Sequence, residues 1–242
     1  FTSGASYLLH QLRRIDALRR KRDQNRTWTL DTAVAYNAMV RHATSYNHGP
    51  GTTQDGWRST GTFFKLLGLL PYLNSLDVNT LVLLPITEIG TIGRKGLLGS
   101  PYAVKHPFRL DPQLKEPCID MTVDDQARVL IEISHLLGIK VVLETVLRTV
   151  SIDSDYAPIH PNWFYWVDEE KVGSIEAFRS PSFSPADLRT MHEKVEEGDF
   201  TQLPEPPAEY QTLFDLMPLR VAKDEHGWKG IGPHGAVLRI PG

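Results

Sequence analysis

Four polar residues follow IKVVL in the segment IKVVLETVLRT, residues 139–149, and every residue of IKVVL except Lys140 is apolar. The run has the composition of a strand buried inside a sheet. After it, Glu144 can accept hydrogen bonds, whereas Arg148 and Thr149 can donate them. Functional side chains in α/β proteins lie at the carboxyl ends of strands, so the segment predicts part of a binding site. The structural alternative is an ion pair between Glu144 and Arg148 at the strand end.

Histidine residues do not show the spacing of a metal site. His42, His48 and His106 are not separated by the intervals that a zinc site needs. Another hypothesis is a sugar-phosphate enzyme on a doubly wound sheet. It is weakened because no glycine-rich phosphate loop follows a predicted strand at the required spacing. We therefore expect no metal ion and no cofactor.

Strand and helix patterns alternate around the polar residues. The predicted order is strand, helix, strand, helix, strand, over residues 35–41, 60–76, 79–85, 122–137 and 139–146. Pro71 inside the first helix predicts a kink or a broken last turn. Thr122 should cap the second helix and Gly138 should end it. This order is typical of right-handed βαβ units with a parallel sheet, and residues 86–112 read as a long glycine-rich loop.

Three segments follow from these patterns. Residues 1–34 predict an N-terminal helical segment, residues 35–150 hold the three βα units, and residues 151–242 show no further alternation. In the last segment, residues 184–199 and 204–217 predict helices. The four consecutive aromatics at 163–166 favour a small separate core, with a sugar-stacking surface as the alternative.

Composition excludes several classes of partner. The chain has 242 residues, 41% apolar and 23% charged, with a net charge of −3, which is ordinary for a globular protein. It lacks the excess of cations that drives nucleic-acid binding, and no apolar run is long enough to span a membrane. The basic residues between Arg13 and Arg26 favour a solvated helix face, since no aromatics are interleaved with them, and a nucleic-acid-binding arm is the alternative. Cys118 is the one cysteine, which favours a reducing compartment, and we expect the cytoplasm.

Residues 62–167 resemble the alpha-amylase family of glycoside hydrolases. FFKLLGLLPYLNSLDVNTLVLLPI is similar to that family's first helix and second barrel strand, and SPYAVKHPFRLDP to its GY-x5-Y-x-IDP stretch. VDDQARVLIEISHLLGIKVVLETVLRT is similar to the approach to its first conserved region, which usually ends D-x-V-x-N-H. SYNHGPG, TGTFFK and the Arg-Thr pair resemble the 4-α-glucan maltosyltransferases most closely. IGTIGRKG resembles the maltosyltransferases that use maltose 1-phosphate.

The resemblance implies an incomplete (β/α)8 TIM barrel. Residues 35–150 would be its first three βα units, and residues 151–242 a helical, irregular insertion after the third strand. A complete barrel needs eight strands, so strands 4 to 8 are an expected partner. Because the chain starts at Phe1 and ends without a terminal element, we expect it to be a piece of a longer protein.

The resemblance also assigns roles to residues. Tyr102 stands in place of the family's sugar-stacking tyrosine, offering a flat face and a hydroxyl, although it could instead pack under its loop with Phe108. Glu144, Arg148 and Thr149 replace the family's Asp, Asn and His. An arginine cannot ligate a cation, so we expect no calcium there. The expected substrate-binding residues are Tyr102, Arg148, Thr149, Lys105, His106, Arg94 and Lys95. The expected supporting residues are Glu144 and Asp111.

Together these roles describe one wall of a glucan-binding site that has no catalytic residues of its own. Arg94 and Lys95 could bind phosphate or sugar hydroxyls from their loop, or could equally be solvated. Retaining glycoside transfer needs two carboxylates about 5 Å apart, and the family's three catalytic carboxylates lie on strands 4, 5 and 7, beyond this chain. We thus expect part of a retaining transferase that moves maltosyl or glucanosyl units between α-1,4-glucans or maltooligosaccharides, inactive by itself. The alternative is a non-catalytic carbohydrate-binding or assembly module with an amylase-like partial barrel.

Overall fold

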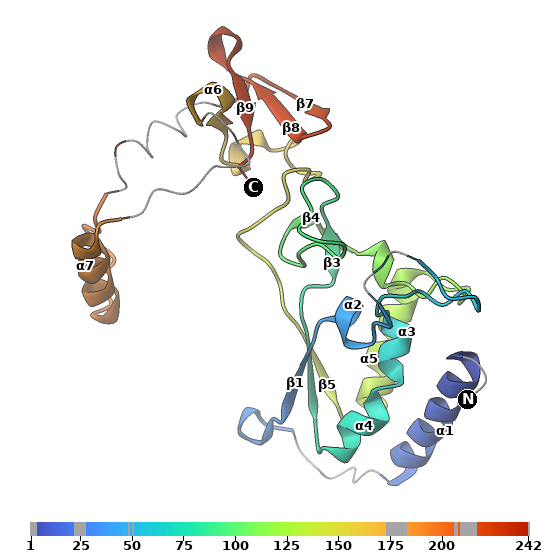
Figure 1. The fold of residues 1–242 in the computed structure, drawn as a ribbon. Helices are drawn as coiled ribbons and strands as arrows, with labels where there is room; N and C mark the ends of the chain where they lie inside the picture. Colours follow the sequence, from blue (N-terminus) through green and yellow to red (C-terminus); the bar gives the residue numbers. More distant parts are fainter. Residues whose placement is uncertain are drawn as a thin grey trace. The chain divides into compact units, whose positions relative to one another are not determined.

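The computed structural model in Figure 1 describes residues 4–21, 28–47, 49, 51–172, 183–205, 208 and 217–241. These residues form two compact units, called here unit 1 (Phe1–Ser151) and unit 2 (Ile152–Gly242). Each unit has its own cluster of buried apolar side chains.

A three-stranded parallel sheet lies at the centre of unit 1. Its strands, in spatial order, are β1 (Ala35–Ala38), β2 (Thr80–Leu83) and β5 (Lys140–Leu143). Tyr36, Leu81 and Val141 stand in register across the three strands. The α/β class and the parallel pairing predicted from the order of elements are confirmed. The carboxyl ends of all three strands therefore meet at one edge of the sheet.

The first predicted helix is two helices. They are α3 (Phe63–Leu67), which Thr62 caps by accepting a hydrogen bond from the Lys65 backbone N–H, and α4 (Leu70–Ser75). Pro71 lies in the first turn of α4, where its missing N–H leaves no helical hydrogen bond unmade. The helical segment is thus interrupted between Leu67 and Leu70, before Pro71. The proline lies at the start of a new helix and does not kink an existing one.

The second predicted helix, α5 (Val123–Leu136), is confirmed with both of its ends. The Thr122 hydroxyl accepts a hydrogen bond from the backbone N–H of Asp125 at 3.1 Å. After the helix, Gly138 adopts φ +79°, a left-handed conformation that any residue with a Cβ reaches only at a cost. The chain can therefore enter β5 directly.

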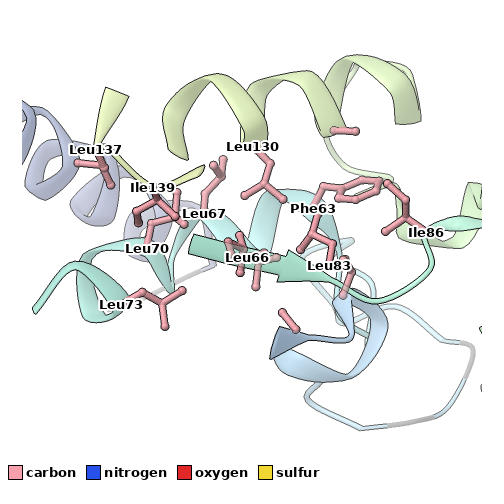
Figure 2. Close-up of a cluster of buried hydrophobic side chains, with 14 of the residues drawn as sticks. Phe63, Leu66, Leu67, Leu70, Leu73, Leu83, Ile86, Leu130, Leu137 and Ile139 are labelled. Atoms are coloured by element: carbon pink, nitrogen blue, oxygen red, sulfur yellow. The ribbon is translucent and has the colours of Figure 1, made fainter. Parts of the chain in front are cut away.

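Helices α3, α4 and α5 cover one face of the sheet and form the main core with it (Figure 2). Leu66, Leu67, Leu81 and Leu130 are fully buried, and burying one such side chain contributes roughly 1.5–3 kcal/mol. Helix α1 (Gly4–Lys21) adds Leu8 and Ile15 to this core. The arginines of α1 face solvent, and Arg19 and Arg20 pair with Asp16. The basic residues after Lys21 lie outside the described part.

Residues 86–112 are not one long loop, which corrects the sequence prediction. They contain an antiparallel pair, β3 (Thr87–Ile89) and β4 (Val104–Leu110), joined by the glycine-rich residues 90–103. Register shifts interrupt the pair, and Pro107 lies within β4, a residue that sheets accept only at edges or irregular positions. Because of these two features, the strands do not show the regular alternation of apolar and polar residues that predicts a strand from sequence.

Unit 2 contains a four-stranded antiparallel sheet, so the prediction of a helical, irregular insertion is wrong. The order is β6 (Val167–Asp168), β9 (Val237–Arg239), β8 (Gly227–Ile231) and β7 (Arg220–Asp224). Helices α6 (Glu169–Val172) and α7 (Pro185–Glu196) also occur, and α7 confirms the helix predicted from residue 184. Most of the helix predicted over 204–217 lies outside the described residues.

The aromatic run divides between the core and the surface of unit 2. Trp166 is 1% exposed and packs with Leu238, and Phe164 packs against the same cluster. Trp163 and Tyr165 are 65% and 69% exposed. Alternate residues thus point in opposite directions, and only two of the four aromatics form the separate core that the sequence favours.

Candidate functional site

Glu144 lies directly after β5, at the carboxyl edge of the parallel sheet. Its backbone N–H donates to the carbonyl of Leu83 at 2.9 Å, which continues the pairing of β5 with β2 by one residue. The side chain is half-buried. The sheet therefore fixes the position of this carboxylate.

Tyr102 meets Glu144 from the segment before β4. Its hydroxyl donates a hydrogen bond to the Glu144 carboxylate, and this bond is the main cause that raises the pKa of Tyr102 above its ordinary value, with smaller effects from desolvation and the negative charge. The Tyr102 side chain remains 42% exposed. Phe108, its alternative packing partner, is 84% exposed and contacts the ring of His106 instead. The phenol is thus oriented but still accessible to a ligand.

Thr149 joins the same cluster. Its hydroxyl donates to the Tyr102 carbonyl at 3.0 Å, and two residues further the backbone N–H of Ser151 donates to the carbonyl of Val104 at 2.9 Å. The segment after β5 therefore runs alongside the residues before β4. The structure brings together Tyr102, Glu144 and Thr149, three of the predicted residues, and we call them the strand-end cluster.

Arg148 stands apart from that cluster. It is exposed, and it makes no ion pair with Glu144, both residues lying in the described part of the chain. The structural alternative suggested by the sequence is therefore not formed. Its guanidinium group has five N–H donors that a ligand at the strand ends could use.

Lys105 and His106 lie on β4 and are engaged within the hairpin. Lys105 pairs with Glu88 of β3 at 3.2 Å, and the second oxygen of Glu88 pairs with Arg109 at 2.9 Å. His106 accepts a hydrogen bond through Nδ1 from the backbone N–H of Phe108 at 3.2 Å. Ligand contacts from these two side chains would compete with the contacts that hold β3 and β4 together.

Arg94 and Lys95 lie in the glycine-rich connection between β3 and β4. Arg94 donates through Nε to the carbonyl of Gly90 at 2.7 Å, whereas the side chain of Lys95 is exposed. Gly93 and Gly96 both have φ +65°, which gives this stretch turns that other residues rarely adopt. Arg94 therefore serves its own turn, and Lys95 faces solvent.

Asp111 supports the hairpin from inside the protein. It forms an ion pair with Arg41 at 2.9 Å, each side chain being 3% exposed, and Arg41 also donates to the carbonyl of Leu98 at 2.8 Å. Burial lowers the pKa of Arg41, which the charge of Asp111 partly opposes. The pair ties the segment after β1 to the far end of the hairpin that carries Tyr102.

Glu116, which belongs to no recognisable sequence motif, organises the loop after β1. Its carboxylate is fully buried and accepts from the Arg58 backbone N–H at 2.6 Å and from the Thr62 hydroxyl at 2.9 Å. Its own backbone N–H donates to Gln126 of α5 at 2.7 Å. Three segments are thus held at the start of α3. Neither this buried acid nor Arg41 has a sequence motif that would have revealed it.

A separate pocket of about 420 Å³ opens between α1 and the loop after β1. Its wall includes Tyr7, Tyr46, Trp57 and Leu69, and none of the predicted site residues lines it. The described residues contain no cluster of three or more potential metal ligands from His, Cys, Asp and Glu. In the same part of the chain, no helix is both long and apolar enough to cross a membrane.

The chain is similar to glucan-acting maltosyltransferases. An alpha-1,4-glucan:maltose-1-phosphate maltosyltransferase of Burkholderia pseudomallei is 29% identical over 156 residues, covering 59% of this chain and 13% of the relative. A protein of the same name from Cereibacter sphaeroides is 26% identical over 161 residues, covering 61% of this chain and 22% of the relative. The resemblance to maltosyltransferases indicated by the sequence is confirmed. The chain spans less than a quarter of the length of these two relatives.

Solved alpha-amylases also match part of the chain. The enzyme from Lactobacillus plantarum is 33% identical with a TM-score of 0.44, covering 55% of this chain and 27% of that one. A maltogenic alpha-amylase from Thermotoga neapolitana is 28% identical with a TM-score of 0.43, covering 57% and 28%. No family model matches the chain.

Proposed function

We propose that this chain is part of a retaining transferase that moves maltosyl or glucanosyl units between α-1,4-glucans. The observation that carries the proposal is the strand-end cluster at the carboxyl edge of a parallel sheet, in which Glu144 orients an accessible tyrosine side chain and Thr149 holds the backbone of that tyrosine. An aromatic face suits the C–H face of a sugar, and the phenol and hydroxyl suit its polar groups. The maltosyltransferase relatives support a glucan as the ligand.

The catalytic carboxylates would lie outside this chain. A retaining transferase uses two carboxylates about 5 Å apart, one as nucleophile and one as acid and base. The strand-end cluster has one carboxylate, and its hydrogen bond to Tyr102 suits support rather than attack. In this proposal Tyr102, Arg148 and Thr149 contact the glucan, and Lys105, His106, Arg94 and Lys95 form the adjoining wall.

The remainder of a barrel would cover β5. In the described residues no strand pairs with the outer edge of β5, and Val142, Leu143 and Leu147 are 43%, 48% and 92% exposed. Parallel sheets are normally buried on both faces, and unpaired apolar edges promote aggregation. Strands 4 to 8 of a (β/α)8 barrel would bury this surface. With its single cysteine, the protein fits a reducing compartment, and we place it in the cytoplasm.

The test is to combine glucan binding with glucan turnover. Calorimetric titration of this chain with maltoheptaose should give binding that Tyr102→Ala weakens about tenfold. The matched change Tyr72→Ala removes a 56% exposed tyrosine on α4 and should change the affinity less than twofold. Absence of binding, or equal effects of the two substitutions, would overturn the proposal.

A second candidate function is a non-catalytic carbohydrate-binding module, which the single carboxylate of the strand-end cluster also favours. Chromatography of maltoheptaose incubated with the chain should show no new products under either candidate. New products would contradict the placement of the catalytic carboxylates. Products formed by the parent polypeptide, and lost when Tyr102 is replaced, would favour the transferase over the binding module.

A further inference from the structure

Three aromatic rings lie nearly parallel on the surface of unit 2. The rings of His160 and Trp163 stack with centroids 3.9 Å apart and planes 14° apart. The ring of Tyr156 lies 6.1 Å from Trp163 and 6.3 Å from His160, with its plane within 16° of both. We call Tyr156, His160 and Trp163 the ring platform.

Backbone hydrogen bonds fix the ring platform in place. The N–H of His160 donates to the Tyr156 carbonyl at 2.8 Å, and the N–H of Trp163 donates to the His160 carbonyl at 2.9 Å. In the same segment, the indole N–H of the buried Trp166 donates to the Pro161 carbonyl at 2.8 Å. The backbone that carries the rings is therefore held, and the stacking of His160 on Trp163 positions these two rings before any ligand arrives, which lowers the entropy cost of binding.

The segment that carries the ring platform is partly exposed and contains no permanently charged side chain. Trp163 is 65% exposed, and Ile159 and Tyr165 beside it in the sequence are 64% and 69% exposed. Residues 156–167 contain no Asp, Glu, Lys or Arg. A nucleic acid or an anionic membrane would need cations here, so the chemistry favours an uncharged ligand. Exposed apolar surface of this kind commonly marks a binding site.

A neutral sugar polymer satisfies these conditions best. The face of an aromatic ring accepts the C–H face of a pyranose, while the indole N–H of Trp163 and the exposed amide of Asn162 can bond to its hydroxyls. We propose that the ring platform is a second contact for an α-glucan chain, in unit 2, in addition to the strand-end cluster of unit 1. This inference rests on the proposed function for the nature of the polymer.

The experiment compares two sites in the same binding assay. In titrations of the whole chain with amylose, Trp163→Ala should weaken the affinity about five- to tenfold, whereas Trp163→Phe, which keeps a ring, should stay within threefold of the original. Tyr72→Ala removes an aromatic side chain that is 56% exposed in unit 1 and serves as the control, with less than a twofold change expected. Circular dichroism of each variant checks that its fold is retained.

The outcomes separate the two proposals. If Tyr102→Ala weakens amylose binding and Trp163→Ala does not, the ring platform is overturned while the proposed function stands. If the original chain fails to bind amylose, both proposals fall. If Trp163→Ala alters only self-association in sedimentation, the rings serve a protein contact, and the inference is wrong.

Discussion

Replacing Arg41 with methionine tests whether the buried ion pair holds the Tyr102 hairpin in place. Arg41 and Asp111 are each 3% exposed, so Arg41→Met leaves a carboxylate inside the protein without its cation. Breaking a buried pair in this way costs roughly 3–5 kcal/mol. Asp111 keeps one partner, because it still accepts from the Gln113 backbone N–H at 2.8 Å. We therefore expect the lower end, about 3 kcal/mol, together with the loss of the bond from Arg41 to Leu98.

The double variant Arg41→Met/Asp111→Asn gives the pairwise contribution. Removing both charges leaves no buried ion, so the double variant should be about 2 kcal/mol more stable than the sum of the two single effects predicts. Arg128→Met on α5 is the control, since its side chain is 77% exposed and the change should stay within about 0.5 kcal/mol.

Hydrogen exchange measured by mass spectrometry is the suitable assay, because its peptides report on each unit separately. Tryptophan fluorescence would mix the signals of the two units, since both contain tryptophans. Peptides from β3, β4 and the residues between them should lose protection in Arg41→Met, while peptides of unit 2 should not change. A loss of stability below 1 kcal/mol, or single effects that add fully in the double variant, would refute the reasoning.

Three further predictions concern the strand-end cluster, the second unit and the core. Glu144→Gln should lower the pKa of Tyr102 towards its ordinary value, because the hydrogen bond to the carboxylate is the main cause of the raised pKa. The pKa is measured by following the resonances of isotope-labelled tyrosine against pH, and an unchanged pKa would contradict the hydrogen bond. Hydrogen bonds from Arg239 lower the pKa of Asp224, so their stabilisation of unit 2 should be complete above the ordinary carboxyl pKa of about 3.9 and be lost as pH falls through the lower folded value. Urea unfolding followed by pulsed hydrogen exchange of unit 2 peptides should show this loss in the original chain and less of it in Asp224→Asn. Identical acid dependence in the two proteins would count against the pair. Leu130→Ala, at a fully buried position, should cost roughly 2–5 kcal/mol in unfolding experiments, whereas Leu136→Ala, at a position 45% exposed, should cost under about 1 kcal/mol, and similar losses would argue against the core shown in Figure 2.

The parallel sheet could be predicted because its elements carry their own signals. Strands β2 and β5 are apolar runs, α5 is amphipathic between Thr122 and Gly138, and the order of elements restricts the pairing. The sheet of unit 2 could not, because its strands are two to five residues long and none of them alternates between buried and exposed positions. Such strands are defined by their partners rather than by a periodic pattern.

The candidate site follows the same division. The sequence predicts Tyr102, Glu144 and Thr149 as site residues because they stand near strand ends and at positions that resemble a known family, and the structure places them together. Arg41 was missed because its partner Asp111 is 70 positions away in the sequence, and a buried charge has no local pattern. The environment of such a residue comes from tertiary contacts alone.

The most direct measurement for the whole account is a crystal structure of this chain with maltoheptaose. The account predicts a glucose ring against the exposed face of Tyr102, with polar contacts from Thr149 or Arg148, and no cleaved product. A complex in which the glucan leaves Tyr102 bare, or in which this chain alone has transferred or cut it, would contradict the account.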